Sequence, residues 1–284
     1  MKTNKLISVA ISLVVFLLSQ VAYAQPAGSM WRGYECNGSY CPAYILDNNS
    51  GTPISFESTF CGVIGFGGGF TSTTTEIQLV PNYNEANEYA IIGLGVGQQS
   101  QAGDSDPYMS VLCVPYSWFS PAVTVIYNTW TYAQSAGESS DTYMIANNGD
   151  DFCYLTGVKG KFSVSADQGF VGNLTSFSPD FYLSESSVTV ATIYGSCIKF
   201  AGHHTMTSYS ISGGSTQMPL PSSTEAFCAV TDIQGNFNYN ISSSPDGEPF
   251  VGVALNGSSG QTLEVGAPGT NSVGVGVTCV NYSN

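Results

Sequence analysis

The sequence predicts an all-β fold made of three tandem repeat units, each stapled by a disulfide. The motif FCYLTGVKGKF at Phe152–Phe162 recurs at Phe227–Phe237 and, more loosely, at Phe60–Phe70. Eight cysteines accompany these copies, and only 9% of the residues are charged. A chain rich in Gly, Ser, Thr, Tyr and Phe favours many short strands and turns. No amphipathic helix pattern occurs beyond the first 24 residues, so we expect either sandwich-like units or one three-lobed β assembly.

Residues 1–24 are predicted to be a secretory signal peptide. Lys2 and Lys5 precede the apolar run Leu6–Ser19, and Ala22-Tyr23-Ala24 supplies the small residues of a cleavage site. An apolar run of about 14 residues is short for a bilayer core of roughly 30 Å, so we expect cleavage rather than anchoring. The mature chain has no second run of this kind, which predicts a secreted protein without membrane insertion.

The mature chain is strongly acidic. Removal of the signal leaves four basic residues against twenty acids and changes the formal charge from −14 to −16. Binding to a phosphate backbone takes clustered Lys and Arg that release counterions, and no such cluster is present. Nucleic acid and anionic lipid are therefore not expected as partners.

The repeat also predicts how the cysteines pair. Eight cysteines allow on the order of a hundred connectivities, but equivalent positions in a repeat should have equivalent partners. Each motif copy is followed by a β-rich segment with one further cysteine, which favours pairing within a unit over bridges between neighbouring units. The predicted disulfides are Cys61–Cys113, Cys153–Cys197, Cys228–Cys279 and, in a small N-terminal loop, Cys36–Cys41. By the chain-entropy estimate each of the three long-range bridges stabilises the fold by about 4 kcal/mol.

The repeat divides the chain into a segment at 25–34 and three β units at 35–118, 119–202 and 203–284. Within the motif, side chains are expected to alternate between two faces. Phe152, Tyr154, Thr156, Val158 and Phe162 then share one face, and Cys153, Leu155, Lys159 and Lys161 share the other. The glycines common to all copies are Gly68, Gly160 and Gly235, and we expect a bulge or tight turn there because glycine tolerates positive φ.

The sequence provides little for catalysis. The histidines are His203 and His204, a dipeptide without a counterpart in the preceding unit, and no GxSxG or HExxH motif occurs. We therefore name no catalytic residue and favour a protein that is not an enzyme, with a secreted hydrolase as a weaker alternative.

No cofactor is expected, and calcium is the open alternative. Asp104 and Asp106, and the neighbouring pair Asp150 and Asp151, lie in Gly- or Asn-rich stretches that could supply hard oxygen ligands. Neither group has the spacing of an EF-hand, and solvated turn acids are the simpler interpretation.

Aromatic residues suggest a ligand-binding role. Trp31, Trp118 and Trp130, with seventeen tyrosines, suit surfaces on which rings stack against sugars, and His203 and His204 join them as candidate ligand residues. The leading hypothesis is a secreted, adhesin- or lectin-like protein that binds glycans or cell-surface ligands. Self-assembly into an extracellular matrix, coat or appendage is the alternative. We expect function to reside where the three units differ, in the loops after each motif and around the histidines.

Overall fold

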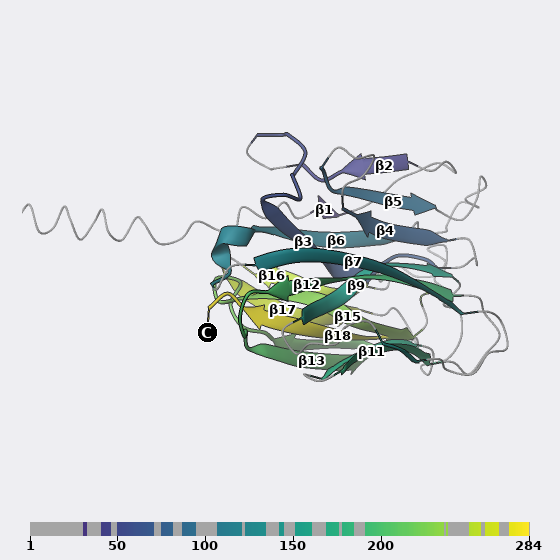
Figure 1. Ribbon diagram of the computed structural model, residues 1–284. Coiled ribbons are helices and arrows are strands. Elements are labelled where there is room, and N and C mark those ends of the chain that lie inside the picture. The colour runs from purple at the N-terminus through teal and green to yellow at the C-terminus, as the bar shows by residue number, and fades with distance from the viewer. Residues whose placement is uncertain are drawn as a thin grey trace, which may run out of the picture.

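The computed structural model describes most of the three units (Figure 1). The described residues are 31–32, 41–46, 50–70, 75–81, 87–94, 107–120, 123–134, 142–144, 151–160, 169–175, 178–184, 191–235, 237, 250–256, 259–266 and 273–283. The predicted signal peptide and the loops that follow the three motifs lie outside these ranges.

Each unit contributes six strands. Unit 1 is counted here together with the preceding segment 25–34, which supplies β1 (Trp31–Arg32). It then has β2 (Cys41–Tyr44), β3 (Thr59–Gly67), β4 (Glu76–Val80), β5 (Ala90–Leu94) and β6 (Tyr108–Pro115), followed by the short 3₁₀ helix η2 (Tyr116–Trp118). Unit 2 has β7 (Val123–Gln134), β8 (Thr142–Met144), β9 (Asp151–Gly160), β10 (Gly169–Thr175), β11 (Ser178–Ser184) and β12 (Ala191–Phe200). Unit 3 has β13 (Met206–Gly213), β14 (Ser215–Pro219), β15 (Ala226–Gly235), β16 (Phe250–Asn256), β17 (Gly260–Gly266) and β18 (Val273–Asn281). The all-β prediction is confirmed.

No sheet belongs to a single unit. Sheet I has the order β1-β6-β3-β16-β17-β14, sheet II β7-β12-β9-β4-β5-β2, and sheet III β13-β18-β15-β10-β11-β8. Each sheet therefore joins the first, sixth and third strands of one unit to the fourth, fifth and second strands of another. Applied three times, this rule links the units in a closed ring. Figure 1 shows β2, β5 and β4 on one side of the molecule and β13, β18 and β15 on the opposite side. The three-lobed assembly, rather than three separate sandwiches, describes the fold.

The three motif copies form the central strands β3, β9 and β15. Each lies beside the sixth strand of its own unit, and the two cysteines stand directly opposite each other in the register. The resulting disulfides are Cys61–Cys113, Cys153–Cys197 and Cys228–Cys279, the pairs that the repeat predicts. Cys36, and with it the fourth predicted bridge, lies outside the described residues. Three disulfides indicate folding in an oxidising compartment.

The shared glycines end the central strands. Gly68, Gly160 and Gly235 have φ of 83°, 137° and 106°, a region that side chains disfavour and glycine accepts. β9 and β15 end at their shared glycine, and β3 ends one residue before it. The positive φ at this position in all three units is the backbone conformation for which glycine was expected there.

A β-bulge lies earlier in each central strand, and it corrects the predicted alternation of faces. The registers skip one residue between Val63 and Gly65 and between Val230 and Asp232, and the same irregularity occurs at Thr156. An inserted residue shifts all later side chains to the other face. Val158 consequently shares a face with Cys153, and Lys159 shares the face of Phe152, opposite to the prediction.

The core is built where the three central strands contact one another. The first phenylalanine of each motif, Phe60, Phe152 and Phe227, has no exposed surface. Their ring centroids are 4.7 Å (Phe60–Phe227), 6.3 Å (Phe60–Phe152) and 6.4 Å (Phe152–Phe227) apart, within the range of favourable edge-to-face packing. The first phenylalanines of the three motif copies therefore pack together at the centre of the core.

Position three of the motif breaks the three-fold symmetry of this core. It holds a large residue, Tyr154, in unit 2 and the small residues Gly62 and Ala229 in the other units. A Cβ on Gly62 would lie 2.8 Å from the ring of Phe227, so the small residue leaves room for that ring. Tyr154 is completely buried, and this burial raises the pKa of its phenol well above the usual range.

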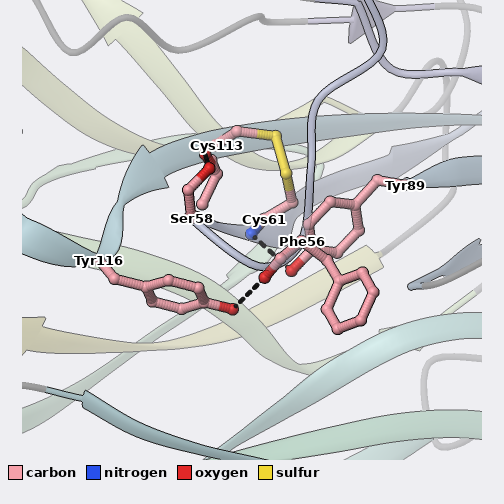
Figure 2. Close-up of a disulfide and its surroundings, with 7 residues drawn as sticks. Phe56, Ser58, Cys61, Tyr89, Cys113 and Tyr116 are labelled. Atoms are coloured by element: carbon pink, nitrogen blue, oxygen red, sulfur yellow. Dashed lines mark hydrogen bonds between the residues drawn. A yellow bond between two sulfur atoms is a disulfide. The ribbon is translucent and has the colours of Figure 1, made fainter. Parts of the chain in front are cut away.

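Two tyrosine hydroxyls fix the chain around the disulfide of unit 1 (Figure 2). Tyr89 accepts a hydrogen bond from the backbone N–H of Cys61 at 3.3 Å, and Tyr116 donates to the carbonyl of Phe56 at 3.0 Å. Because Tyr89 is buried, its hydroxyl must have such a partner. The first bond ties β3 to the residue before β5, and the second ties the segment before β3 to η2. Among the described residues, no helix is long and apolar enough to cross a membrane.

Candidate functional site

Of the three tryptophans named by the sequence, the structure describes the side chain of Trp118 alone. Trp118 lies in η2, is partly buried, and packs edge-to-face on Tyr282 at 5.4 Å between centroids. Its ring therefore packs the C-terminal residues against η2, the segment that connects unit 1 to unit 2. Trp31 and Trp130 lie in β1 and β7, but their side chains are outside the described residues.

The two histidines lie just before β13 and differ in environment. His203 is exposed, whereas His204 is 2% exposed. Nδ1 of His204 lies 2.8 Å from the carbonyl oxygen of Asn281, so this nitrogen carries the proton, and the ring packs against Phe200 at 4.2 Å. These contacts support a structural role for His204.

The acidic candidates for calcium are mostly outside the described residues. Asp104, Asp106 and Asp150 are not described, and Asp151 begins β9, opposite Lys199 of β12. Within the described ranges, no three His, Cys, Asp or Glu side chains come together as a metal site.

The described parts of the units differ at the junctions where two of them share a sheet. There the third strand of one unit pairs with the fourth strand of another: β3 with β16, β9 with β4, and β15 with β10. Motif positions six and eight lie at these junctions, on the same face as the first phenylalanine. They hold Gly65 and Gly67 in unit 1, Gly157 and Lys159 in unit 2, and Asp232 and Gln234 in unit 3. Equivalent positions in the three units therefore hold side chains of different size and charge.

At the junction in sheet II, an ion pair joins units 1 and 2. Nζ of Lys159 lies 3.1 Å from one oxygen of Glu76, and the hydroxyl of Tyr194 donates to the other oxygen at 2.6 Å. Glu76 is 5% exposed, and a buried carboxylate needs partners of this kind. Both carboxylate oxygens are engaged, so this junction serves to hold the two units together.

At the junction in sheet III, an unpaired acid is buried. Asp232 stands opposite Gly276 of β18, and Gln234 stands opposite Gly274. Asp232 is 9% exposed, and its Oδ1 has no hydrogen-bond partner among the described residues. Burial raises the pKa of the Asp232 carboxyl to about 7. The acid is therefore a source of pH-dependent stability.

At the junction in sheet I, two aromatic rings cover glycines. Tyr108 and Phe250 flank Gly67 on the neighbouring strands β6 and β16. Their rings are nearly parallel, with 6° between planes and 6.3 Å between centroids, and both residues are partly exposed. A Cβ on Gly67 would clash with the Tyr108 ring, and one on Gly65 would lie 2.8 Å from the Phe250 ring. The glycines are thus required for the rings to lie this close to the sheet.

Polar side chains continue this face across sheet I. Gly252 stands opposite Glu264, and Glu264 opposite Gln217, so the register places all three on the face of Phe250. The amide of Gln217 donates to the carboxylate of Glu264 at 3.0 Å. We call Tyr108, Phe250, Glu264 and Gln217 the aromatic face of sheet I. Partly exposed rings that share a sheet face with an amide and a carboxylate can bind a ligand that has both an apolar face and hydroxyl groups.

No protein-family model matches the sequence, and no curated protein matches it either. At the junction in sheet II the charges of Lys159 and Glu76 are paired with each other, and at the junction in sheet III Asp232 is buried, so neither junction presents these groups to a ligand. The aromatic face of sheet I therefore offers the best described surface for a ligand.

The sequence reasoning missed Tyr108 and Phe250. Both are ordinary strand aromatics by sequence, and nothing local marks them as neighbours, because β6 and β16 come from different units. A signal was nevertheless present in the motif. Unit 1 alone has glycine at both positions six and eight, Gly65 and Gly67, and glycines in mid-strand often mark a place where a large neighbour approaches closely.

Proposed function

We propose that the protein is a secreted, non-enzymatic glycan-binding protein, adhesin- or lectin-like, whose ligand site is the aromatic face of sheet I. The observation that carries the proposal is the pair of nearly parallel, partly exposed rings of Tyr108 and Phe250, which share a face of sheet I with Glu264 and Gln217. A ring face can pack against the C–H face of a pyranose, while the amide and carboxylate bind its hydroxyl groups.

The charge of the protein narrows the ligand class. With a formal net charge of −14, which becomes −16 once the signal is removed, the protein repels acidic polysaccharides, and Glu264 adds a negative charge within the site itself. A carboxylate accepts hydrogen bonds from neutral hydroxyl groups without this penalty. Neutral saccharides are therefore the expected ligands.

Binding of the secreted protein to an array of neutral and acidic glycans tests the proposal. Tyr108→Ala and Phe250→Ala are each expected to weaken binding to a neutral glycan about tenfold, because a stacking contact is worth roughly 1 kcal/mol or more. Trp118→Ala is the matched control: it removes an aromatic ring that packs on Tyr282, outside the aromatic face. Absence of binding to every glycan, or equal losses in all three variants, would reject the proposal.

A further inference from the structure

The edge strand β13 (Met206–Gly213) lacks the features by which proteins usually protect a sheet edge. It is the terminal strand of sheet III, and among the described residues it pairs with β18 alone. Five of its eight residues are serine, threonine or glycine, and it contains neither a charged residue nor a proline. Natural edge strands are commonly blocked by charges, prolines or bulges. This edge is instead open to another strand.

The register shows which peptide groups face the open edge. The N–H of Asn281 donates to the carbonyl of Thr205 at 3.0 Å, so these two residues form a hydrogen-bonded pair at the start of β13. Hydrogen-bonded pairs alternate along an antiparallel ladder. Odd-numbered residues of β13 therefore bond to β18. The peptide groups directed outward belong to Met206, Ser208, Ser210 and Ser212, and the three serines are exposed.

The charge distribution selects a second copy of this chain as the partner. Residues 205–224, which include β13 and β14, contain no acidic or basic residue, although the chain has twenty acids and six basic residues. Two copies of a protein with a net charge of −14, or −16 without the signal, repel each other over most of their surfaces. They can approach most closely where neither copy carries charge.

We propose that two copies pair through antiparallel β13 strands related by a two-fold axis. The register that uses all four outward residues places Met206 opposite the partner's Ser212 and Ser208 opposite the partner's Ser210. Every outward N–H and C=O of both strands then has a partner, and the two copies of sheet III become one continuous sheet. This pairing does not depend on glycan binding, but it would place two aromatic faces on one particle and so provide avidity.

Sedimentation of the secreted protein over a wide concentration range tests the pairing. The expected result is a reversible dimer. Ser210→Asp is expected to weaken dimerisation about tenfold, because it places two negative charges near each other across the new ladder. Ser210→Asn is the control: asparagine has the shape of aspartate without its charge, so this variant should dimerise like the parent. Ser210→Pro provides a second test, since it removes an N–H that β18 does not use.

Three outcomes would overturn the proposal. They are a monomer at all concentrations, equal effects of Ser210→Asp and Ser210→Asn, and particles that grow beyond the dimer. Continued growth would indicate pairing of β13 with a different edge, such as β7, which generates open-ended chains rather than a closed dimer. Thermal unfolding of each variant shows whether the fold is intact. Binding of a monovalent saccharide, measured separately, shows whether the aromatic face functions independently of dimerisation.

Discussion

The buried carboxyl of Asp232 is predicted to make the protein less stable as the pH rises from about 4 to about 7. In the folded protein burial raises the pKa of this carboxyl from 3.8 to about 7. The folded state therefore holds a proton over a pH interval in which the unfolded chain has already released it. Stability falls with rising pH wherever the folded state binds more protons than the unfolded state.

The size of the effect follows from the two pKa values. Each pKa unit is equivalent to about 1.4 kcal/mol, so the difference between 3.8 and about 7 corresponds to about 4 kcal/mol. This contribution is fully present below the unfolded pKa and is lost as the pH rises through about 7. Asp232→Asn replaces the carboxyl with a neutral group of the same shape. It should be more stable than the parent at pH about 8, by up to about 4 kcal/mol, and equal to it at pH about 3.

Denaturant unfolding of the parent and of Asp232→Asn at a series of pH values measures this difference. Other acids titrate in both proteins, so their contributions cancel in the comparison. Asp232→Gly, which introduces the residue found at the equivalent Gly65 and Gly157, should remove the same part of the pH dependence. Unfolding free energies that stay parallel from pH about 3 to about 8 would refute the reasoning, because they would show that Asp232 has the same pKa in both states.

Three further predictions concern stability. Phe227→Ala should destabilise the fold by about 3–5 kcal/mol, because the ring is fully buried at the meeting point of the three units; a loss below about 1 kcal/mol in a denaturant titration would contradict that position. Gly157→Ala should destabilise markedly, since a Cβ there would lie 2.5 Å from the carbonyl oxygen of Ile77. Gly214→Ala is the control, because a Cβ on Gly214 would have no atom within 4 Å. Equal melting temperatures of the two variants would contradict the close approach of β4 to Gly157. Replacing Cys153 and Cys197 together by serine should cost about 4 kcal/mol, measurable by calorimetry, and an unchanged transition would exclude a stabilising bridge.

The sequence predicts those features that depend on repetition. Three copies of one motif imply equivalent cysteine partners, and the disulfides follow that rule. A glycine shared by all copies implies a backbone that only glycine adopts easily, and the positive φ of Gly68, Gly160 and Gly235 agrees with this. These inferences succeed because they compare equivalent positions in the three copies of the motif.

Other features lie beyond the sequence because they depend on non-local contacts. Strict alternation fails after Thr156, since no residue type marks a bulge. The sharing of sheets between units depends on pairings such as Phe250 with Gly67, which lie far apart in the chain. Trp118 looked like a ligand residue, but its ring packs on Tyr282. The aromatic face was missed for the same reason, because it exists only once β6 and β16 are placed on either side of β3.

The central claim is that the repeat supplies a scaffold while one junction, the aromatic face of sheet I, binds the ligand. A calorimetric titration of the protein with a neutral saccharide tests this claim most directly. We predict one saccharide bound per chain and no measurable binding by the double variant Tyr108→Ala, Phe250→Ala. Three equivalent sites per chain, or unchanged binding by the double variant, would contradict the account.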